Sequence, residues 1–219
     1  MNEDAPIRVR PCSHVLKHTV HLDKVKAERF LLPISKKKTH VIEIHAGQIT
    51  TTDLTISLPP TLNFEPFGGY SKIAAVERHH NTGKIGVAVA KGYGIRNGAV
   101  ASSVSHDSHN IIVIGDNDVD MAIAVNEIIR TQGGYTVVEN GKVYETLALP
   151  IMGLMSDAGF ENVNEALQRM IQKAHQMGVA SQIDPFVTLS FLAFPVIPEL
   201  RITPRGICKM TAKGPAILS

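Results

Sequence analysis

The stretch from residue 72 to residue 116 constrains the fold most, because it holds several apolar segments of strand length separated by polar turns. These segments are residues 73–76, 85–90, 99–104 and 111–114. The last of them, Ile-Ile-Val-Ile followed by Gly115, is apolar at every position. Such a run is typical of a central strand that is buried on both faces of a sheet. The stretch therefore predicts a group of neighbouring strands with a buried centre.

Further strands are predicted on either side of this stretch. Residues 40–46 and 53–58 each alternate apolar and polar side chains, and the short connection around Gly47 favours antiparallel pairing. Downstream, Asn140-Gly141 separates two extended runs within residues 135–147. This dipeptide is the strongest local hairpin signal in the chain.

Two long helices are predicted from apolar residues that recur at helical spacing. The first follows candidate N-caps at residues 116–118 and ends at Gly133-Gly134. The second spans residues 160–177, and Gly178 follows it as a cap.

Three shorter elements complete the prediction. A short helix capped by Asp23 is predicted over residues 22–30, and a buried strand over residues 187–194. A last strand or hairpin is predicted over residues 200–209, around Gly206.

Strands in clusters with inserted helices indicate an α+β fold, in which mixed and antiparallel strands carry two long helices packed on them. A TIM barrel is not expected, because it needs about 250 residues and eight strand–helix units. Residues 1–17 show no period and are predicted to be an irregular tail or linker. Residues 18–219 are predicted to form the domain.

The composition argues against several classes of partner. The formal net charge is only +2 and tryptophan is absent, so neither a nucleic-acid surface nor a membrane surface is expected. No apolar run approaches the ~20 residues of a membrane span, and the N-terminal residues lack the apolar core of a signal peptide. Cys12 and Cys208 are expected to be reduced thiols rather than a disulfide, as in a cytoplasmic protein.

A dense polar cluster, Ser105-His106-Asp107-Ser108-His109-Asn110, directly precedes the apolar run at residue 111. Imidazole and carboxylate groups can move protons or bind a divalent metal. In a continuous strand, His106 and His109 would face opposite sides, so joint action requires a turn, which the surrounding polar residues favour. The alternative is a loop whose polar groups only hydrogen-bond one another.

A second candidate, Glu77-Arg78-His79, also ends an apolar strand. It would meet the first cluster if the two strands were neighbours in the sheet. The alternative is an Arg–Glu pair at a strand end, which contributes little stability if exposed.

The common catalytic motifs are absent from the sequence. It contains no Gly-x-Ser-x-Gly, no Cys-x-x-Cys and no His-Glu-x-x-His, and its paired glycines do not form a phosphate-binding loop. The residues alone therefore indicate an α+β domain with a polar His/Asp/Asn site and no named reaction.

Longer strings in the chain resemble the C-terminal domain of bacterial adenine deaminases. The resemblance is carried mainly by VERHHNTGKIGVAVAKGYGIRNGAVASSVSHDSHNIIVIGDND, followed in the same order by LALPIMGLMSD and PFVTLSFLAFPVIPELRITPRGI. Upstream, VHLDKVKAERFLLPI and HVIEIHAGQITTTDLTISLP resemble the entry into that domain. The similarity spans residues 18–210 and departs from the family at Thr203-Pro204-Arg205-Gly206, where an acidic residue is expected after the threonine.

The resemblance implies hydrolytic deamination of adenine to hypoxanthine and ammonia, in purine salvage, within the amidohydrolase superfamily. The complete enzyme has a metal-bearing (β/α)8 barrel, a small β domain and this C-terminal domain, and manganese or iron ions in the barrel activate the attacking water. Because the chain is too short to contain that barrel, no cofactor is expected in the chain itself. The expected partners are adenine, further copies of this chain and the barrel. In the family the barrel is part of the same chain, and here it could also be supplied by a separate chain.

The match to the family's C-terminal signature covers six candidate site residues. None of them is predicted to bind a metal. His106, Asp107 and His109 are candidate catalytic residues that border the barrel's active site, and the candidates for substrate binding are Arg78, His79 and Asn110.

Three interpretations stay open. The chain is the C-terminal portion of an adenine deaminase that is inactive without the barrel, or it is a non-catalytic purine-binding or oligomerisation module. The third is a small autonomous metal hydrolase built on His106, Asp107 and His109, for which a third metal ligand is not evident.

Overall fold

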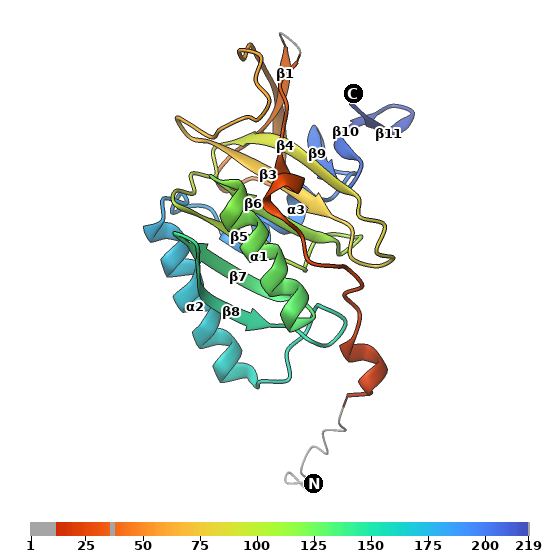
Figure 1. Ribbon diagram of the computed structural model, residues 1–219, viewed down its shortest axis with the longest axis vertical. Coiled ribbons are helices and arrows are strands. Elements are labelled where there is room, and N and C mark those ends of the chain that lie inside the picture. The colour runs from red at the N-terminus through yellow and green to blue at the C-terminus, as the bar shows by residue number, and fades with distance from the viewer. Residues whose placement is uncertain (1–11, 36–37, 219) are drawn as a thin grey trace, which may run out of the picture.

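An eight-stranded sheet forms the centre of the computed structural model, which describes residues 12–35 and 38–218. In spatial order its strands are β2 (Thr51–Ile56), β1 (Thr39–Ile44), β4 (Ile85–Lys91), β3 (Tyr70–Val76), β6 (Ile111–Gly115), β5 (Gly98–Ser102), β7 (Gly134–Glu139) and β8 (Lys142–Ala148). Neighbouring strands are antiparallel except β1 and β4, which are parallel. The described residues form no closed barrel, and the α+β fold class is confirmed (Figure 1).

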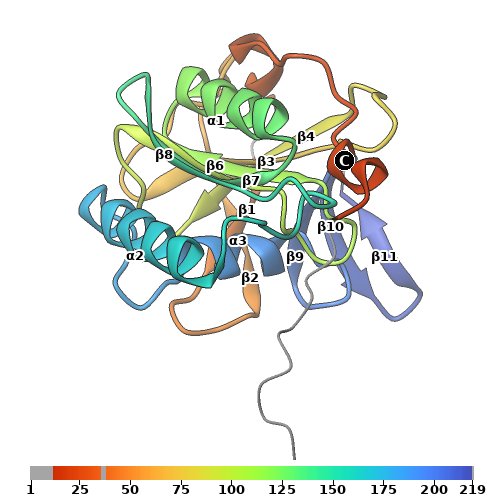
Figure 2. The ribbon, with the colours of Figure 1, turned by 90° about the horizontal axis from the view of Figure 1, so that it is seen from below.

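Helices cover both faces of this sheet. They are α1 (Asp118–Thr131), α2 (Phe160–Gln176) and α3 (Pro185–Leu192), and two 3-10 turns, η1 (His14–Lys17) and η2 (Ala27–Phe30), precede the sheet. Figure 2 shows α1 on one face and α2 and α3 on the other. A second sheet, in the order β11 (Gly214–Ile217), β10 (Gly206–Thr211) and β9 (Leu200–Thr203), packs beside β3 and β4.

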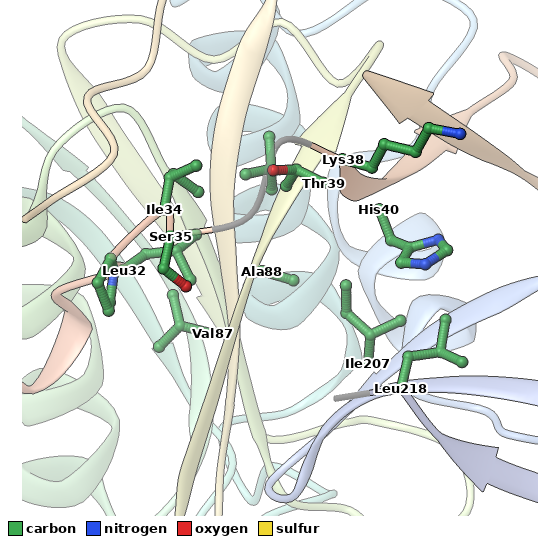
Figure 3. Close-up of a pocket in the computed structure, with 12 residues that line it drawn as sticks. Leu32, Ile34, Ser35, Lys38, Thr39, His40, Val87, Ala88, Ile207 and Leu218 are labelled. Atoms are coloured by element: carbon green, nitrogen blue, oxygen red, sulfur yellow. The ribbon is translucent and has the colours of Figure 1, made fainter. Parts of the chain in front are cut away.

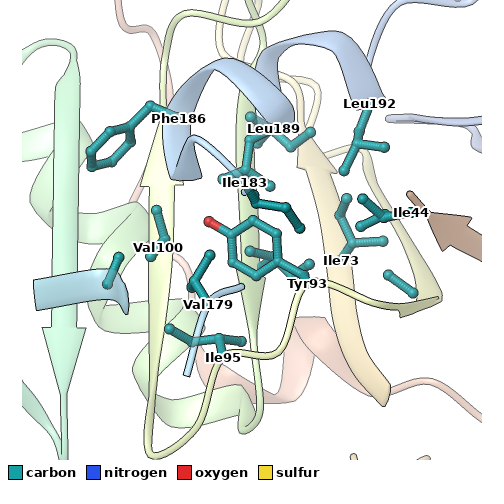
Figure 4. Packing of buried hydrophobic residues seen from close by; sticks show 14 of the residues in the cluster. Ile44, Ile73, Tyr93, Ile95, Val100, Val179, Ile183, Phe186, Leu189 and Leu192 are labelled. Atoms are coloured by element: carbon teal, nitrogen blue, oxygen red, sulfur yellow. The ribbon is translucent and has the colours of Figure 1, made fainter. Parts of the chain in front are cut away.

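The central strands are apolar throughout because each of their faces meets a separate core. In β6, Ile111 and Val113 belong to the cluster beneath α1, whereas Ile112 and Ile114 belong to the cluster beneath α2 and α3. On the second face, side chains of α3 pack around the buried ring of Tyr93 (Figure 4). The Tyr93 hydroxyl donates a hydrogen bond to the Pro185 carbonyl at 3.0 Å. The prediction of a strand buried on both faces is thus confirmed.

An N-terminal segment, residues 18–30, lies over the α1 side of the sheet. Val20, Val25 and Phe30 are buried in the same cluster as α1. Val25 also exchanges two hydrogen bonds of 2.8 Å with the Asn126 side chain of α1. Of the tail predicted at residues 1–17, the first eleven residues lie outside the described residues, and η1 contains no buried residue.

Most predicted elements are confirmed. Strands β1 and β2 form the predicted antiparallel pair, and β7 and β8 form the predicted hairpin, in which Asn140 and Gly141 adopt φ values of +50° and +78°. Both long helices are present, as is the terminal hairpin of β9 and β10. The side chain of Asn117 caps α1 by accepting from the Asp120 N–H.

Two predicted elements are wrong. The predicted strand at residues 187–194 is mostly helix, because Asp184 and Pro185 begin α3 and the side chain of Asp184 accepts from two backbone N–H groups. The predicted helix at residues 22–30 is reduced to the single turn η2. Its backbone at Val25 bonds to Asn126 instead of forming a helical ladder.

No helix in the described ranges is both long enough and apolar enough to cross a membrane.

Candidate functional site

The loop of residues 103–110 connects β5 to β6 and is anchored at several points. Ser103 donates from its backbone N–H to the Gly134 carbonyl at 3.0 Å and from its hydroxyl to the Gly153 carbonyl at 2.6 Å. The backbone N–H of His106 donates to the Ser190 carbonyl of α3 at 3.1 Å. The sheet and α3 therefore fix the path of a loop whose side chains remain available.

A turn in this loop brings its two histidines together. The backbone N–H of His109 donates to the Ser105 carbonyl at 2.6 Å, and the Ser105 N–H points back at His109 Nδ1 at 3.3 Å. The His106 and His109 ring centroids are 6.0 Å apart. Because Nδ1 of His109 accepts a hydrogen bond, its neutral ring carries the proton on Nε2. The turn that joint action of the two histidines requires is present.

His106 lies at the boundary between an apolar wall and solvent. Its half-buried ring packs against Phe191 and Phe194, with centroid distances of 5.1 and 6.0 Å. The exposed Asp107 carboxylate is 3.8 Å from His106 Nδ1. In water such a separation gives a weak ion pair, so Asp107 remains free to contact another group.

Burial favours the neutral form of His109. Desolvation is the main cause that lowers its pKa below 6.5, and the positive charges of His106 and Arg78 add to the effect, while Asp107 opposes it. A neutral imidazole at neutral pH can accept a proton or donate a hydrogen bond.

Arg78, at the end of β3, is a buried clamp beneath the loop. Its side chain is 2% exposed and donates to the carbonyl of His109, to that of Thr19 at 3.2 Å and to that of Met152 at 3.0 Å. Burial lowers its pKa, and among the described residues no ion pair joins it to Glu77. The Arg–Glu pair considered from the sequence is therefore wrong.

Glu77 instead organises the turn that follows β3. Although desolvation acts in the opposite direction, hydrogen bonds from the backbones of Thr82, His79 and His80 and from the Thr82 hydroxyl lower its pKa to about 2. The carboxylate thus fixes the turn that carries His79.

His79 and Asn110 complete the contact between the two polar clusters. A ring nitrogen of His79 lies 2.7 Å from the Ser108 carbonyl. The Asn110 side chain accepts from the Arg78 N–H at 3.3 Å and donates to the Ser108 hydroxyl at 3.1 Å. Because β3 and β6 are antiparallel neighbours, the end of β3 meets the beginning of β6. The structure therefore brings all six candidate residues to one edge of the sheet.

Sequence reasoning missed the part of the site that α3 contributes. Phe191 and Phe194 form the apolar wall against His106, and the buried hydroxyls of Ser105 and Ser190 have no hydrogen-bond partner in the described ranges. The available signal was the Asp184-Pro185 helix start, since a helix beginning there directs Ser190 and Phe191 differently from a strand.

Side chains that could bind a metal occur across the described part of the chain. No group of three or more His, Cys, Asp or Glu side chains in residues 12–35 and 38–218 could hold a metal ion. His106, Asp107 and His109 do not belong to such a group. What these three side chains can supply is hydrogen bonding and proton transfer.

A hollow of about 310 Å³ lies elsewhere, between β1, β4 and the beginning of β10 (Figure 3). Its lining is largely aliphatic, with His40 at one side. His40 Nδ1 is 2.7 Å from the Asp53 carboxylate, which also binds Lys209 at 2.9 Å. The hollow shares no lining residue with the 103–110 loop, so the two are separate features.

The loop presents a neutral imidazole, a half-exposed imidazole and an exposed carboxylate beside an aromatic wall. Such groups can hydrogen-bond a nitrogen heterocycle and transfer protons. The loop can therefore serve as one side of an active site.

Comparison with known proteins agrees with the family resemblance described from the sequence. The family model for the adenine deaminase C-terminal domain matches residues 48–213. An adenine deaminase of Desulfitobacterium hafniense is 46% identical over 208 residues, covering 94% of this chain and 37% of the relative. The adenine deaminase of Clostridium acetobutylicum is 42% identical over 200 residues, covering 88% of this chain and 34% of the relative.

The chain spans about a third of the length of the curated relatives it matches. The matched residues include β2 to β10 and all six candidate site residues. The chain therefore belongs to the adenine deaminase C-terminal domain family.

Proposed function

We propose that this chain is the C-terminal portion of an adenine deaminase, which converts adenine and water to hypoxanthine and ammonia. The observation that carries the proposal is that relatives named adenine deaminase match nearly the whole chain, while the chain accounts for about a third of each relative. The activity then requires the part that this chain lacks, a metal-bearing barrel. Bound manganese or iron in that barrel would supply the activated water.

In this proposal the 103–110 loop closes one side of the active site. Half-buried His106 and exposed Asp107 are the groups that reach the substrate, and His109 is the neutral imidazole beside them, whose Nε2–H can donate a hydrogen bond. Arg78 and Asn110 act mainly by holding the loop, because their polar groups are directed at Ser108, His109 and backbone atoms. His79 lies at the rim and is the candidate for a direct contact with adenine.

The proposal extends to the setting of the protein. We take residues 18–219 as the domain, which works in the cytoplasm in purine salvage and as part of a homo-oligomer. Buried free Cys208 and half-buried free Cys12 agree with a reducing compartment.

The first test compares the purified chain with the full-length Desulfitobacterium hafniense relative. Ammonia release from adenine is followed with added Mn²⁺ or Fe²⁺, and metal content is determined on the same samples. We expect turnover by the relative and none by the chain. Turnover by the chain with stoichiometric metal would show that no barrel is needed. Adenine binding without turnover in either sample would favour a purine-binding module.

The second test uses a chimera in which this chain replaces the matching third of the same relative. We expect His106→Ala and Asp107→Ala to lower kcat by about tenfold or more, as for lost proton-transfer or positioning groups. His80→Ala is the matched control, because His80 is an exposed histidine outside the loop. Equal kcat values for all three variants would remove the loop from the active site.

A further inference from the structure

An apolar surface lies beside the 103–110 loop. Met152, Met155 and Phe160, here called the Met–Phe surface, are exposed, with Met155 at 52% and Phe160 at 79%. They come from the connection between β8 and α2 and from the first residue of α2. Large apolar side chains grouped in this way mark surfaces that bind other protein parts.

A hollow of about 480 Å³ opens next to these residues. Phe160 and Met155 line its mouth, and its other walls include Leu147, Leu149 and Leu167. Such an aliphatic lining offers few partners for a polar small molecule and suits inserted apolar side chains.

The hollow and the histidine loop are parts of one edge. The Ser103 hydroxyl donates to the Gly153 carbonyl at 2.6 Å, within the connection that carries the Met–Phe surface. Arg78 binds the carbonyls of both His109 and Met152, so a single guanidinium joins the two features. The connection that carries the Met–Phe surface is therefore tied to the 103–110 loop at Ser103 and, through Arg78, at His109.

The N-terminal segment reaches the same edge. The Met152 N–H donates to the Leu16 carbonyl at 2.6 Å, and Lys17 pairs with Asp157. Beyond these contacts η1 stands away from the sheet, below β8 in Figure 1, with Val15 80% exposed. The matched family is a C-terminal domain, and the Desulfitobacterium hafniense relative has most of its length outside the match, so we infer that its remaining part connects at the N-terminal end of the matched residues.

We propose that the Met–Phe surface and its hollow are the docking site for the preceding, barrel-containing part of adenine deaminase. This inference rests on the proposed function and adds to that function the surface that brings the barrel to the histidine loop. The covalent connection enters at this edge, no other described residue covers the apolar surface, and the relatives carry nearly two thirds of their length outside this domain. A contact of about 600–1,500 Å² is typical between domains of one chain, and it would bury all three side chains.

Hydrogen exchange followed by mass spectrometry tests the proposal on the free chain and on the chimera defined above. In the chimera, we expect amides of residues 153–162 to exchange about tenfold more slowly than in the free chain. Amides of residues 59–68, at the far side of the sheet beside β1 and β2, should exchange equally in both. The full-length Desulfitobacterium hafniense relative provides a second measurement on its matching segment. Equal exchange of residues 153–162 in free chain and chimera would overturn the proposal.

Substitutions separate docking from other causes of protection. Phe160→Glu and Met155→Glu should return the exchange of residues 153–162 in the chimera to the free-chain rate. Both positions are exposed, and a carboxylate at residue 160 suits a helix N-terminus, so folding should be unaffected. Leu62→Glu is the matched control, because Leu62 is 91% exposed and lies outside this surface. Protection that survives both substitutions would contradict the proposal.

Two further outcomes are distinguishable. If sedimentation velocity shows the free chain to be a dimer that Phe160→Glu dissociates, a second copy occupies the surface and the proposal is wrong. If the chimera protects residues 153–162 but His106→Ala leaves its ammonia release unchanged, docking stands and the role proposed for the loop fails.

Discussion

Arg78 shows how one buried residue can hold several parts of the chain together. Its guanidinium joins the 103–110 loop, the N-terminal segment and the connection after β8 through three backbone carbonyls. A Cβ at Gly153 would lie 2.7 Å from Arg78 Nη1, so the residue beside the clamp must be glycine. These contacts explain why a buried cation is tolerated without a carboxylate partner from the described part of the chain.

Arg78→Lys should therefore destabilise the fold strongly. Lysine cannot reach three separated carbonyls, and acceptors left unpaired in a buried site cost about 1–3 kcal/mol each. We expect a loss of about 2–4 kcal/mol in the free energy of unfolding, measured with urea. Arg169→Lys is the control, since Arg169 is exposed and pairs with Glu145 on the surface, and its loss should stay below about 1 kcal/mol. Similar values for the two variants would argue against the clamp.

His109 should make stability depend on pH. Burial, followed by the charges of His106 and Arg78, lowers its pKa in the folded state below the 6.5 of an unperturbed histidine. Folding thus favours the neutral form: this stabilisation is complete above pH 6.5 and is lost as the pH falls through 6.5 toward the lower folded-state pKa. The stabilisation from ionised Glu77 is lost only below pH 4.5, so the pH ranges in which the two residues affect stability are separate.

Replacement of this histidine tests the assignment. We expect His109→Asn to flatten the decline in unfolding free energy between about pH 7 and pH 5, because asparagine tolerates the positive φ at this position and does not titrate. His80→Asn, at an exposed position, should keep the wild-type slope. An unchanged slope in His109→Asn would show that another group causes the decline.

At this scale the sequence predicts the polar half of the site but not its apolar half. His79 follows β3 and the loop of His106 precedes β6, so a prediction that places these two strands side by side also brings the two polar clusters together. Phe191 and Ser190 carry no such signal. They contact the 103–110 loop only because α3 packs across β5 and β6, which lie far from α3 in the sequence.

At the scale of elements, local sequence patterns predict a strand or helix correctly wherever one face of that element is polar. Strands β1 and β2 alternate, the β7–β8 hairpin carries Asn-Gly, and α2 has one apolar stripe against a charged face. Helix α3 is not predicted by such a pattern, because it is apolar nearly all round. Its apolar residues therefore show neither helical nor strand spacing. Its identity is set by its N-terminus, where Asp184 precedes Pro185.

Removing that N-terminal signal should weaken α3. The Asp184 carboxylate accepts from the N–H groups of Phe186 at 2.9 Å and Val187 at 2.8 Å. We expect Asp184→Ala to cost about 1 kcal/mol in unfolding free energy, the usual cost of losing an N-cap. Asp184→Asn keeps an accepting oxygen and should stay within about 0.5 kcal/mol of wild type. A loss in Asp184→Asn as large as in Asp184→Ala would mean that the charge, and not the cap, stabilises the helix.

At the scale of the whole molecule, the order of the strands could not be predicted. The parallel pairing of β1 with β4 places the first hairpin beside strands that come much later in the chain. Apolar runs such as residues 111–114 predict burial on both faces but do not say which elements cover each face. The N-terminal segment illustrates this limit, since nothing in its spacing shows that Val20, Val25 and Phe30 complete the core over α1.

The same segment gives a prediction for the whole domain. Phe30 is fully buried against the α1 cluster, whereas Val15 in η1 is exposed. We expect Phe30→Ala to cost about 3–5 kcal/mol in unfolding free energy, as for other large-to-small core changes, and Val15→Ala to change it by less than about 0.5 kcal/mol. A chain that begins at residue 18 should unfold within about 1 kcal/mol of the full chain, because the described contacts that it loses are the exposed ones of η1. A larger loss in the shortened chain would move the domain boundary upstream of residue 18, and it would make η1 part of the domain rather than the connection that leads to it.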